Sequence, residues 1–184
     1  MRSKFRAAPV SLVVAVCVVA SGCTAQPSPP NTPAPTTTPL FASDEEALAA
    51  AEEAYAAYLA VTDQIFAEGG NDLTALKEVA VGRQLKDDSL GFEDVASRGY
   101  RSVGTTKFSD VSLQQFSPET LQRMIVVYLC EDVSDIDVFD PSGASVVQSD
   151  RPDRVKYEVA FDAVGGRPTA LLVSNREPWG NGRC

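Results

Sequence analysis

The stretch RVKYEVAFDAV, residues 154–164, alternates apolar and polar side chains more clearly than the rest of the chain. Every second position is apolar, namely Val155, Tyr157, Val159 and Phe161. Successive side chains of a strand point to opposite faces of a sheet. The alternation therefore predicts a strand with one face packed against another layer.

The residues before this strand predict the second layer as helices. Ser43-Asp44-Glu45-Glu46 has the form of a capping box, and apolar residues then recur at helical spacing until Gly69-Gly70. A short second helix is expected from Asp72 to Gly82. A third is expected from Arg83 to Gly99, interrupted around residues 89–91.

After Gly99 the apolar period changes from about 3.6 to 2, which predicts a sheet. The expected strands are residues 100–116, 121–132, 136–139, 144–148, 154–164 and 169–175. Phe108 is out of phase with Val111 and Leu113, which indicates a β-bulge. The predicted fold is α+β, with N-terminal helices packed on a strongly bent antiparallel sheet.

The N-terminus has the pattern of an export signal. Three basic residues precede an apolar run from Pro9 to Ala20, which is shorter than the roughly 20 residues that a helix needs to span a bilayer. Residues 19–23, Val-Ala-Ser-Gly-Cys, resemble a bacterial lipobox. This resemblance implies cleavage before Cys23 and acylation of that cysteine. The alternative is a secreted protein that is cleaved near Ala25.

These features divide the chain into three parts. Residues 1–22 are expected to be a lipoprotein signal peptide. Residues 23–42 begin with the lipidated cysteine and continue as a disordered tether, because residues 24–39 are almost wholly Pro, Thr, Ser, Ala and Asn. Residues 43–184 form one domain. The protein is therefore expected to be lipid-anchored at the cell membrane, with this domain on the extracytoplasmic side.

Charge and cysteine usage narrow the possible partners. Without residues 1–22 the chain has 13 Lys and Arg against 25 Asp and Glu, a formal charge of −12, which argues against nucleic-acid binding. Of the four cysteines, Cys17 leaves with the signal peptide and Cys23 is the lipid site. Cys130 and Cys184 remain, and in an oxidising compartment they indicate a disulfide. A reactive thiol pair is the alternative, but the two lack CxxC spacing.

The order of helices and strands resembles the NTF2-like (SnoaL-like) superfamily, in which helices cover a cone-shaped sheet. Exported actinobacterial lipoproteins of this type are similar in three features: a lipobox at Cys23 before a Pro/Thr tether, the segment VVYLCED at residues 126–132 leading into VFDPSG at 138–143, and the tail WGNGRC at 179–184. The resemblance implies that Cys130 and Cys184 pair. It implies no reaction, because fold does not fix function.

Histidine is absent, which excludes Ser-His-Asp and Cys-His catalytic arrangements and His-ligated zinc. A buried carboxylate base remains possible, with Asp63, Glu158 and Asp162 as candidates. Glu158 and Asp162 lie on the polar side of the alternation. The aspartates between residues 132 and 140 lack the spacing of a calcium loop. We expect no catalytic residue, no metal site and no cofactor.

The sequence thus predicts a non-enzymatic extracytoplasmic lipoprotein that binds an apolar small molecule, a lipid or an envelope protein. The candidate pocket residues are Met124, Val126, Tyr128, Tyr157 and Phe161. Trp179 is expected either to cover the mouth of this pocket or to pack on the sheet. One alternative is an isomerase or cyclase that uses a buried carboxylate. Another is a structural or assembly module of the cell envelope.

Overall fold

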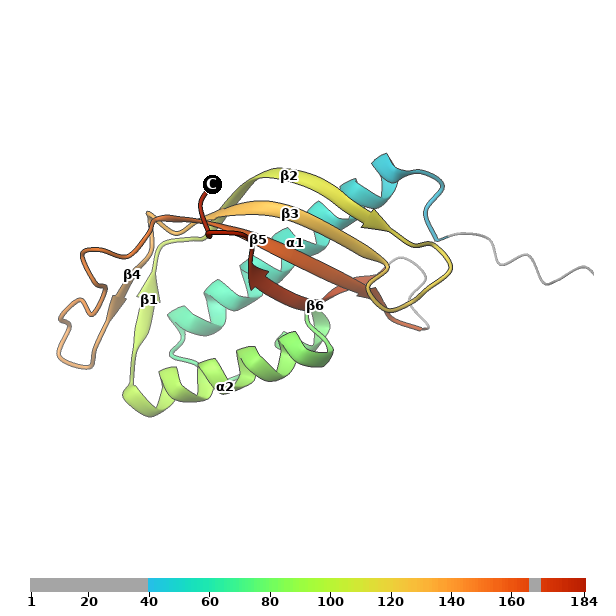
Figure 1. Cartoon of the computed structure of the whole chain (residues 1–184). Helices are drawn as coiled ribbons and strands as arrows, with labels where there is room; N and C mark the ends of the chain where they lie inside the picture. The colour runs from blue at the N-terminus through green and yellow to red at the C-terminus, as the bar shows by residue number, and fades with distance from the viewer. Residues whose placement is uncertain (1–39, 166–169) are drawn as a thin grey trace, which may run out of the picture. The chain divides into compact units, whose positions relative to one another are not determined.

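The computed structural model describes residues 40–165 and 170–184. Two helices lie on one face of a four-stranded antiparallel sheet with the order β2-β3-β5-β6 (Figure 1). The helices are α1 (Asp44–Ala67) and α2 (Gly82–Arg98), and the strands are β2 (Lys107–Phe116), β3 (Ile125–Asp132), β5 (Arg154–Ala163) and β6 (Leu171–Pro178). Two short strands, β1 (Arg101–Val103) and β4 (Asp137–Phe139), form a separate ladder. The predicted α+β class is confirmed.

The first helix begins and ends as its sequence predicts. The Ser43 hydroxyl accepts a hydrogen bond from the backbone N–H of Glu46 at 3.3 Å, and Glu46 in turn accepts one from the backbone N–H of Ala42 at 2.7 Å. The second contact reaches one residue before the cap. Gly69 and Gly70 follow the helix with positive φ angles of 85° and 72°, a conformation that ends a helix at little cost only for glycine.

The predicted second helix is wrong, because the structure has only a 3₁₀ turn there, η1 (Leu76–Glu78). The chain after it runs along the edge of β6. Val173 donates its backbone N–H to the carbonyl of Val79 at 3.0 Å and accepts from the N–H of Val81 at 2.9 Å. These non-local hydrogen bonds satisfy backbone groups that a continued helix would have used internally.

The third predicted helix is correct, but its interruption is not, since α2 is continuous through residues 89–91. The Ser89 hydroxyl donates to the carbonyl of Leu85 at 2.7 Å, which keeps its hydrogen bond within the helix. Leu85 and Phe92 pack against the core on either side of this point. Tertiary packing thus outweighs the weak helix preference of Ser89 and Gly91. Gly99 ends the helix in the left-handed conformation, as predicted.

The first predicted strand, residues 100–116, is divided into β1 and β2 by a sharp turn at Gly104, where φ is +95°. The predicted bulge lies in β2, where the pairing with β3 shifts between Ser109 and Ser112 and Asp110 takes a φ of 55°. The segment 144–148 is not a strand and makes one isolated bridge, between Ser145 and Phe139. The other strands differ from prediction only at their ends.

The expected strong bend of the sheet is not found. Irregular pairing is confined to β2 and to one point between β5 and β6, whereas β3 and β5 pair without a break from Ile125 opposite Phe161 to Asp132 opposite Arg154. Because bulges are what bend a strand sharply, an unbroken central ladder leaves the sheet twisted but not strongly curled (Figure 1).

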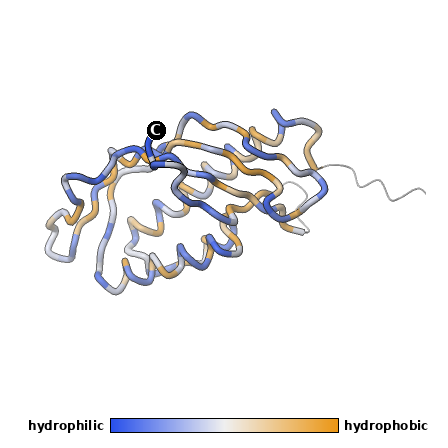
Figure 2. The backbone as a smooth tube through the Cα atoms, viewed as in Figure 1, coloured by the Kyte–Doolittle hydropathy of each residue, from blue (hydrophilic) through white to orange (hydrophobic). Residues whose placement is uncertain are grey.

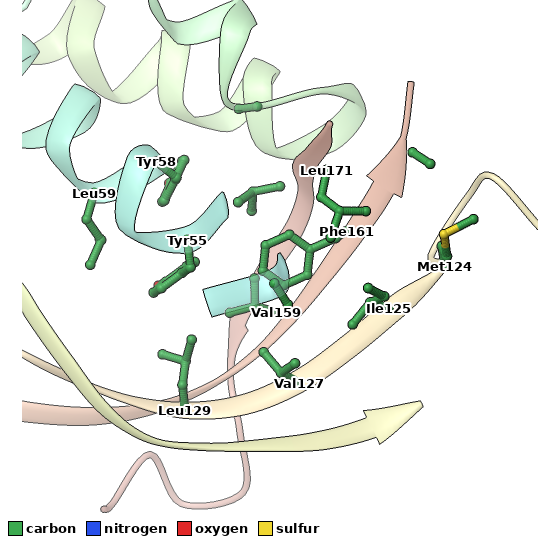
Figure 3. Close-up of a cluster of buried hydrophobic side chains, with 14 of the residues drawn as sticks. Tyr55, Tyr58, Leu59, Met124, Ile125, Val127, Leu129, Val159, Phe161 and Leu171 are labelled. Carbon is green, nitrogen blue, oxygen red and sulfur yellow. The ribbon is translucent and has the colours of Figure 1, made fainter. Parts of the chain in front are cut away.

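The hydrophobic core lies between α1 and the inner face of the sheet. Figure 2 shows β3 as an almost continuously hydrophobic stretch. Its residues Ile125, Val127 and Leu129 point toward the helices, with Phe161 of β5 beside them, and face Tyr55 and Tyr58 of α1 (Figure 3). Within the described residues, no helix is both long and apolar enough to cross a membrane.

Candidate functional site

A charged group interrupts the apolar inner face at the end of β3. Glu131 follows Ile125, Val127 and Leu129 on the same side of the strand. Strand alternation therefore carries its side chain into the interior, and the residue is 3% exposed. Arg176 of β6 reaches both carboxylate oxygens, with Nε 2.6 Å from Oε1 and Nη2 2.5 Å from Oε2. The pair is therefore bidentate, the strong geometry for arginine and a carboxylate.

Two tyrosines complete this group. The Tyr55 hydroxyl donates to Oε1 of Glu131, and the guanidinium of Arg176 lies 3.9 Å from the centre of the Tyr157 ring. Burial, and after it the charge of Glu131, raises the pKa of Tyr55 well above its usual value, so Tyr55 remains a donor. Burial alone would lower the pKa of Arg176, but Tyr55, Glu131 and Tyr157 outweigh it and raise the pKa.

A second buried polar group joins the two helices. The Tyr58 hydroxyl of α1 donates to Asp88 of α2 at 2.9 Å, and Gln84 Nε2 donates to Asp88 at 2.8 Å and to the Tyr58 oxygen at 3.0 Å. Burial raises the pKa of Asp88, and burial with the nearby Asp88 charge raises that of Tyr58. The Tyr55 and Tyr58 rings stack with centres 5.7 Å apart, which connects the two groups.

A cavity of about 300 Å³ lies between the helices and the sheet, beside both groups. Its charged lining residues are Asp63, Asp88, Glu131 and Arg176, and its aromatic ones are Tyr58, Phe66 and Phe92. Asp63 is fixed by Thr106, which donates its backbone N–H at 2.7 Å and its hydroxyl at 2.8 Å. The polar groups of this cavity are therefore held in place by neighbouring residues, as in a preformed binding site.

A larger hollow of about 620 Å³ lies beside β4 and is lined by Tyr100, Val138 and residues 146–148 and 150–152. It is open to solvent and lies on the surface next to the short β1–β4 ladder. Its polar side chains include none of the buried ones described above. We therefore take the smaller cavity, with its buried and mutually bonded polar groups, as the candidate site.

The five predicted pocket residues are not brought together. Met124, Tyr157 and Phe161 belong to or pack against the core, whereas Val126 and Tyr128 alternate with the inward residues of β3 and lie on the outer face. The cavity described above is lined by none of the five. Residues 125–130 are apolar or aromatic at every position, so alternation alone does not assign the faces of β3.

Sequence reasoning missed Tyr55, Tyr58, Asp88, Glu131 and Arg176. The sequence contains a signal for the inward position of Glu131, because this residue is in phase with Ile125, Val127 and Leu129. It contains no such signal for Arg176. The irregularity between β5 and β6 at Ala160 and Phe161 places both Val173 and Arg176, three residues apart, on the inner side, and a regular strand would put them on opposite faces.

The remaining predicted site residues are the cysteines and the three candidate carboxylates. Cys23 lies outside the described residues, and Cys130 and Cys184 form a disulfide. Of the three candidate carboxylates, Asp63 lines the cavity, whereas Glu158 on the outer face is paired with Arg123 at 3.2 Å and Asp162 accepts from the backbone N–H of Arg123 at 2.7 Å. In residues 40–165 and 170–184, no three His, Cys, Asp or Glu side chains are grouped to hold a metal ion.

Trp179 packs on the outer face of the sheet. Its ring centre is 4.7 Å from that of Tyr128, and the residue is 43% exposed. The neighbouring tail is fixed by the disulfide to β3 and by a hydrogen bond of 3.1 Å from the backbone N–H of Lys156 to the carbonyl of Gly182. Of the two expectations for Trp179, packing on the sheet is the correct one.

Comparison with known proteins gives a likeness of fold. No family model matches the chain, and no curated protein sequence matches it. The crystal structure of the intermembrane space region of the chloroplast protein ARC6 is similar, with a TM-score of 0.51 and 14% identity, covering 71% of this chain and 95% of that one. A solution structure of a de novo designed β-sheet protein has a TM-score of only 0.31, with 12% identity over 75% of this chain and 91% of that one. The chain therefore shares an α+β fold with the ARC6 domain, and at this identity the likeness extends to the fold alone.

Proposed function

We propose that the protein is a membrane-anchored, extracytoplasmic binding module that takes a small molecule with an apolar body into the cavity between α1, α2 and the sheet. The observation that carries the proposal is this cavity of about 300 Å³, which combines aromatic walls with buried polar groups fixed by one another. Sites of this kind need little rearrangement on binding, which favours affinity.

The contacts of Glu131 favour binding over catalysis. Its carboxylate accepts from Tyr55 and is held by Arg176 at 2.5 and 2.6 Å. A general base needs a carboxylate that is free to take a proton from the substrate. A bidentate guanidinium occupies both of its oxygens, so Glu131 serves as a structural charge in the lining of the cavity.

The proposed location rests on two features. The Cys130–Cys184 disulfide is typical of proteins in oxidising compartments outside the cytoplasm. Residues 19–23 support an acylated Cys23 as the attachment to the membrane. The NTF2-like relationship is part of the proposal, supported by the order of helices and strands. The acidic composition argues against a nucleic-acid partner.

Native mass spectrometry of the full chain, extracted from its own membranes, tests this function. We expect a retained small molecule and a mass that includes the acyl groups on Cys23. The variant Thr62→Trp should lose the retained molecule, because Thr62 lines the cavity and the indole would fill it. Ala57→Trp adds the same side chain at an exposed position of α1 and should retain it. An empty wild-type protein, or equal retention by both variants, would contradict the proposal.

A second candidate function is an isomerase or cyclase that uses a buried carboxylate. The observation in its favour is Asp88, which lines the cavity and has a pKa raised by burial. If Asp88 is the base, the turnover of a substrate found by the mass measurement should rise with pH through the pKa of Asp88 and vanish in Asp88→Asn. Release of the retained molecule unchanged after prolonged incubation would count against this function.

A further inference from the structure

The charges in the cavity between α1, α2 and the sheet indicate which class of ligand it takes. We infer that this ligand is a small organic cation, with its ammonium group held by Asp63 and Asp88 and its apolar part against the aromatic walls. The inference rests on the proposed function and makes it more specific.

The lining of the cavity carries more negative than positive charge. Three carboxylates and one guanidinium line the cavity. Arg176 is committed to Glu131 at both oxygens and stacks on Tyr157, so its charge is already compensated. Asp63 and Asp88 form no ion pair with a lining residue, and a half-buried carboxylate is stabilised by an opposite charge.

Asp63 and Asp88 can each accept further hydrogen bonds. An ionised carboxylate has about four acceptor sites. The hydrogen bonds of the described residues fill two on Asp88, from Tyr58 and Gln84, and two on Asp63, from Thr106. Both carboxylates are thus oriented by their neighbours while each keeps acceptor sites for a donor. A primary ammonium group has three donors and a positive charge, which matches this requirement.

Aromatic rings from both helices form the walls of the cavity. Phe66 of α1 and Phe92 of α2 lie edge to face with centres 6.4 Å apart, and both line the cavity with Tyr58. Ring faces attract cations and also accommodate hydrocarbon. An anionic ligand would instead meet two carboxylates, and the charge of the single guanidinium nearby is already paired with Glu131 through Nε and Nη2. Charge and wall chemistry therefore favour the same class of ligand.

Three probes of nearly equal size and different charge test the inference: 2-phenylethylammonium, 2-phenylethanol and 3-phenylpropanoate. Each is titrated into the purified full chain by isothermal titration calorimetry at pH 7.5, with a blank of detergent alone. The cation should bind about 10-fold more tightly than the alcohol, because one charge-assisted hydrogen bond contributes on this scale. The propanoate should bind more weakly than both. Added salt should weaken the binding of the cation only.

Variants locate the effect. Asp88→Asn and Asp63→Asn should each lower the affinity for the cation by about 10-fold and change the affinity for the alcohol by less than about 2-fold. The matched control is Asp87→Asn, one residue away on α2, which is paired with Arg83 at 3.3 Å and half-exposed outside the cavity. It should bind all three probes like the wild type. Unchanged alcohol binding also shows that a variant is folded.

The possible results separate the inference from the function on which it rests. Equal binding of the three probes, or tighter binding of the propanoate, would overturn the cation preference and leave a small-molecule site in place. Cation binding that is unaffected by Asp88→Asn and Asp63→Asn would overturn the assignment to these residues. If none of the three probes binds, the cavity admits no small molecule of this size, and the proposed function fails together with the inference.

Discussion

Glu131 shows how one residue can organise the interior of a small domain. Moving a carboxylate out of water is costly, and the cost is offset only when an opposite charge and hydrogen bonds replace the lost hydration. Here Arg176 supplies the charge from β6, and Tyr55 supplies a hydrogen bond from α1. Because the three partners come from three elements, the group fixes α1 and β6 relative to β3.

Removing one member of this buried group should be strongly destabilising. Glu131→Gln leaves Arg176 without its counter-charge, and we expect a loss of about 3 kcal/mol in the free energy of unfolding, measured by chemical denaturation. The corresponding substitution Asp94→Asn, in an exposed pair with Arg98 at 2.8 Å, should cost less than about 1 kcal/mol. Equal losses in the two variants would show that burial of the Glu131 pair has no special role.

Asp88 should give the protein a measurable dependence of stability on pH. Because burial raises the pKa of Asp88, the folded chain holds this proton more tightly than the unfolded chain. The contribution to stability is complete below the unfolded carboxyl pKa of about 4 and is lost as the pH rises through the raised value. The wild type should therefore lose stability relative to Asp88→Asn between acid and neutral pH. Parallel stability curves for the two proteins would contradict the assignment.

Among the elements, those governed by local chemistry agree with their sequence signals. The capping box at Ser43, the two glycines after α1, the alternation of β5 and the bulge in β2 could all be predicted, because each depends on residues a few positions apart. The failures involve partners far along the chain. Residues 79–81 bond to the edge of β6 rather than forming a helix, and a pairing irregularity turns Arg176 inward.

The separation of β1 from β2 depends on Gly104. Its φ is +95°, and a Cβ there would collide with the backbone carbonyl of Asp135. Gly104→Ala should therefore lower the free energy of unfolding by about 3 kcal/mol or more. Gly143→Ala is the control, since φ is +83° but no atom lies within 4 Å, and it should cost only about 1 kcal/mol. Thermal and urea unfolding of both variants compare the two costs. If they are equal, the approach of Asp135 does not constrain the turn.

At the scale of the whole molecule, the disulfide connects the end of the chain to the centre of the sheet. Cys130 on β3 and Cys184 are 54 residues apart, and the loop they close contains β4, β5 and β6. The candidate site draws on the same region, because Arg176 lies within this loop. The sequence predicted the pairing from the number and context of the cysteines. It did not reveal the site, whose residues meet only after the helices and the sheet have packed.

Replacing both cysteines by alanine should lower the free energy of unfolding by about 4 kcal/mol, the chain-entropy value for a loop of this length. Denaturation of the double variant, compared with the wild type with and without reductant, measures the loss. Reduced wild type and the double variant should unfold at similar denaturant concentrations. Free thiols at both positions in peptides from the non-reduced protein would contradict the bridge.

The position of Trp179 makes it an optical reporter of the tail. It is the only tryptophan in the chain, half-exposed on the outer face against Tyr128, while the cavity lies on the other side of the sheet. Its emission should therefore respond when reduction of the bridge frees the tail, and should stay the same when the cavity is filled. Its emission therefore follows the outer face of the sheet alone, with no added label.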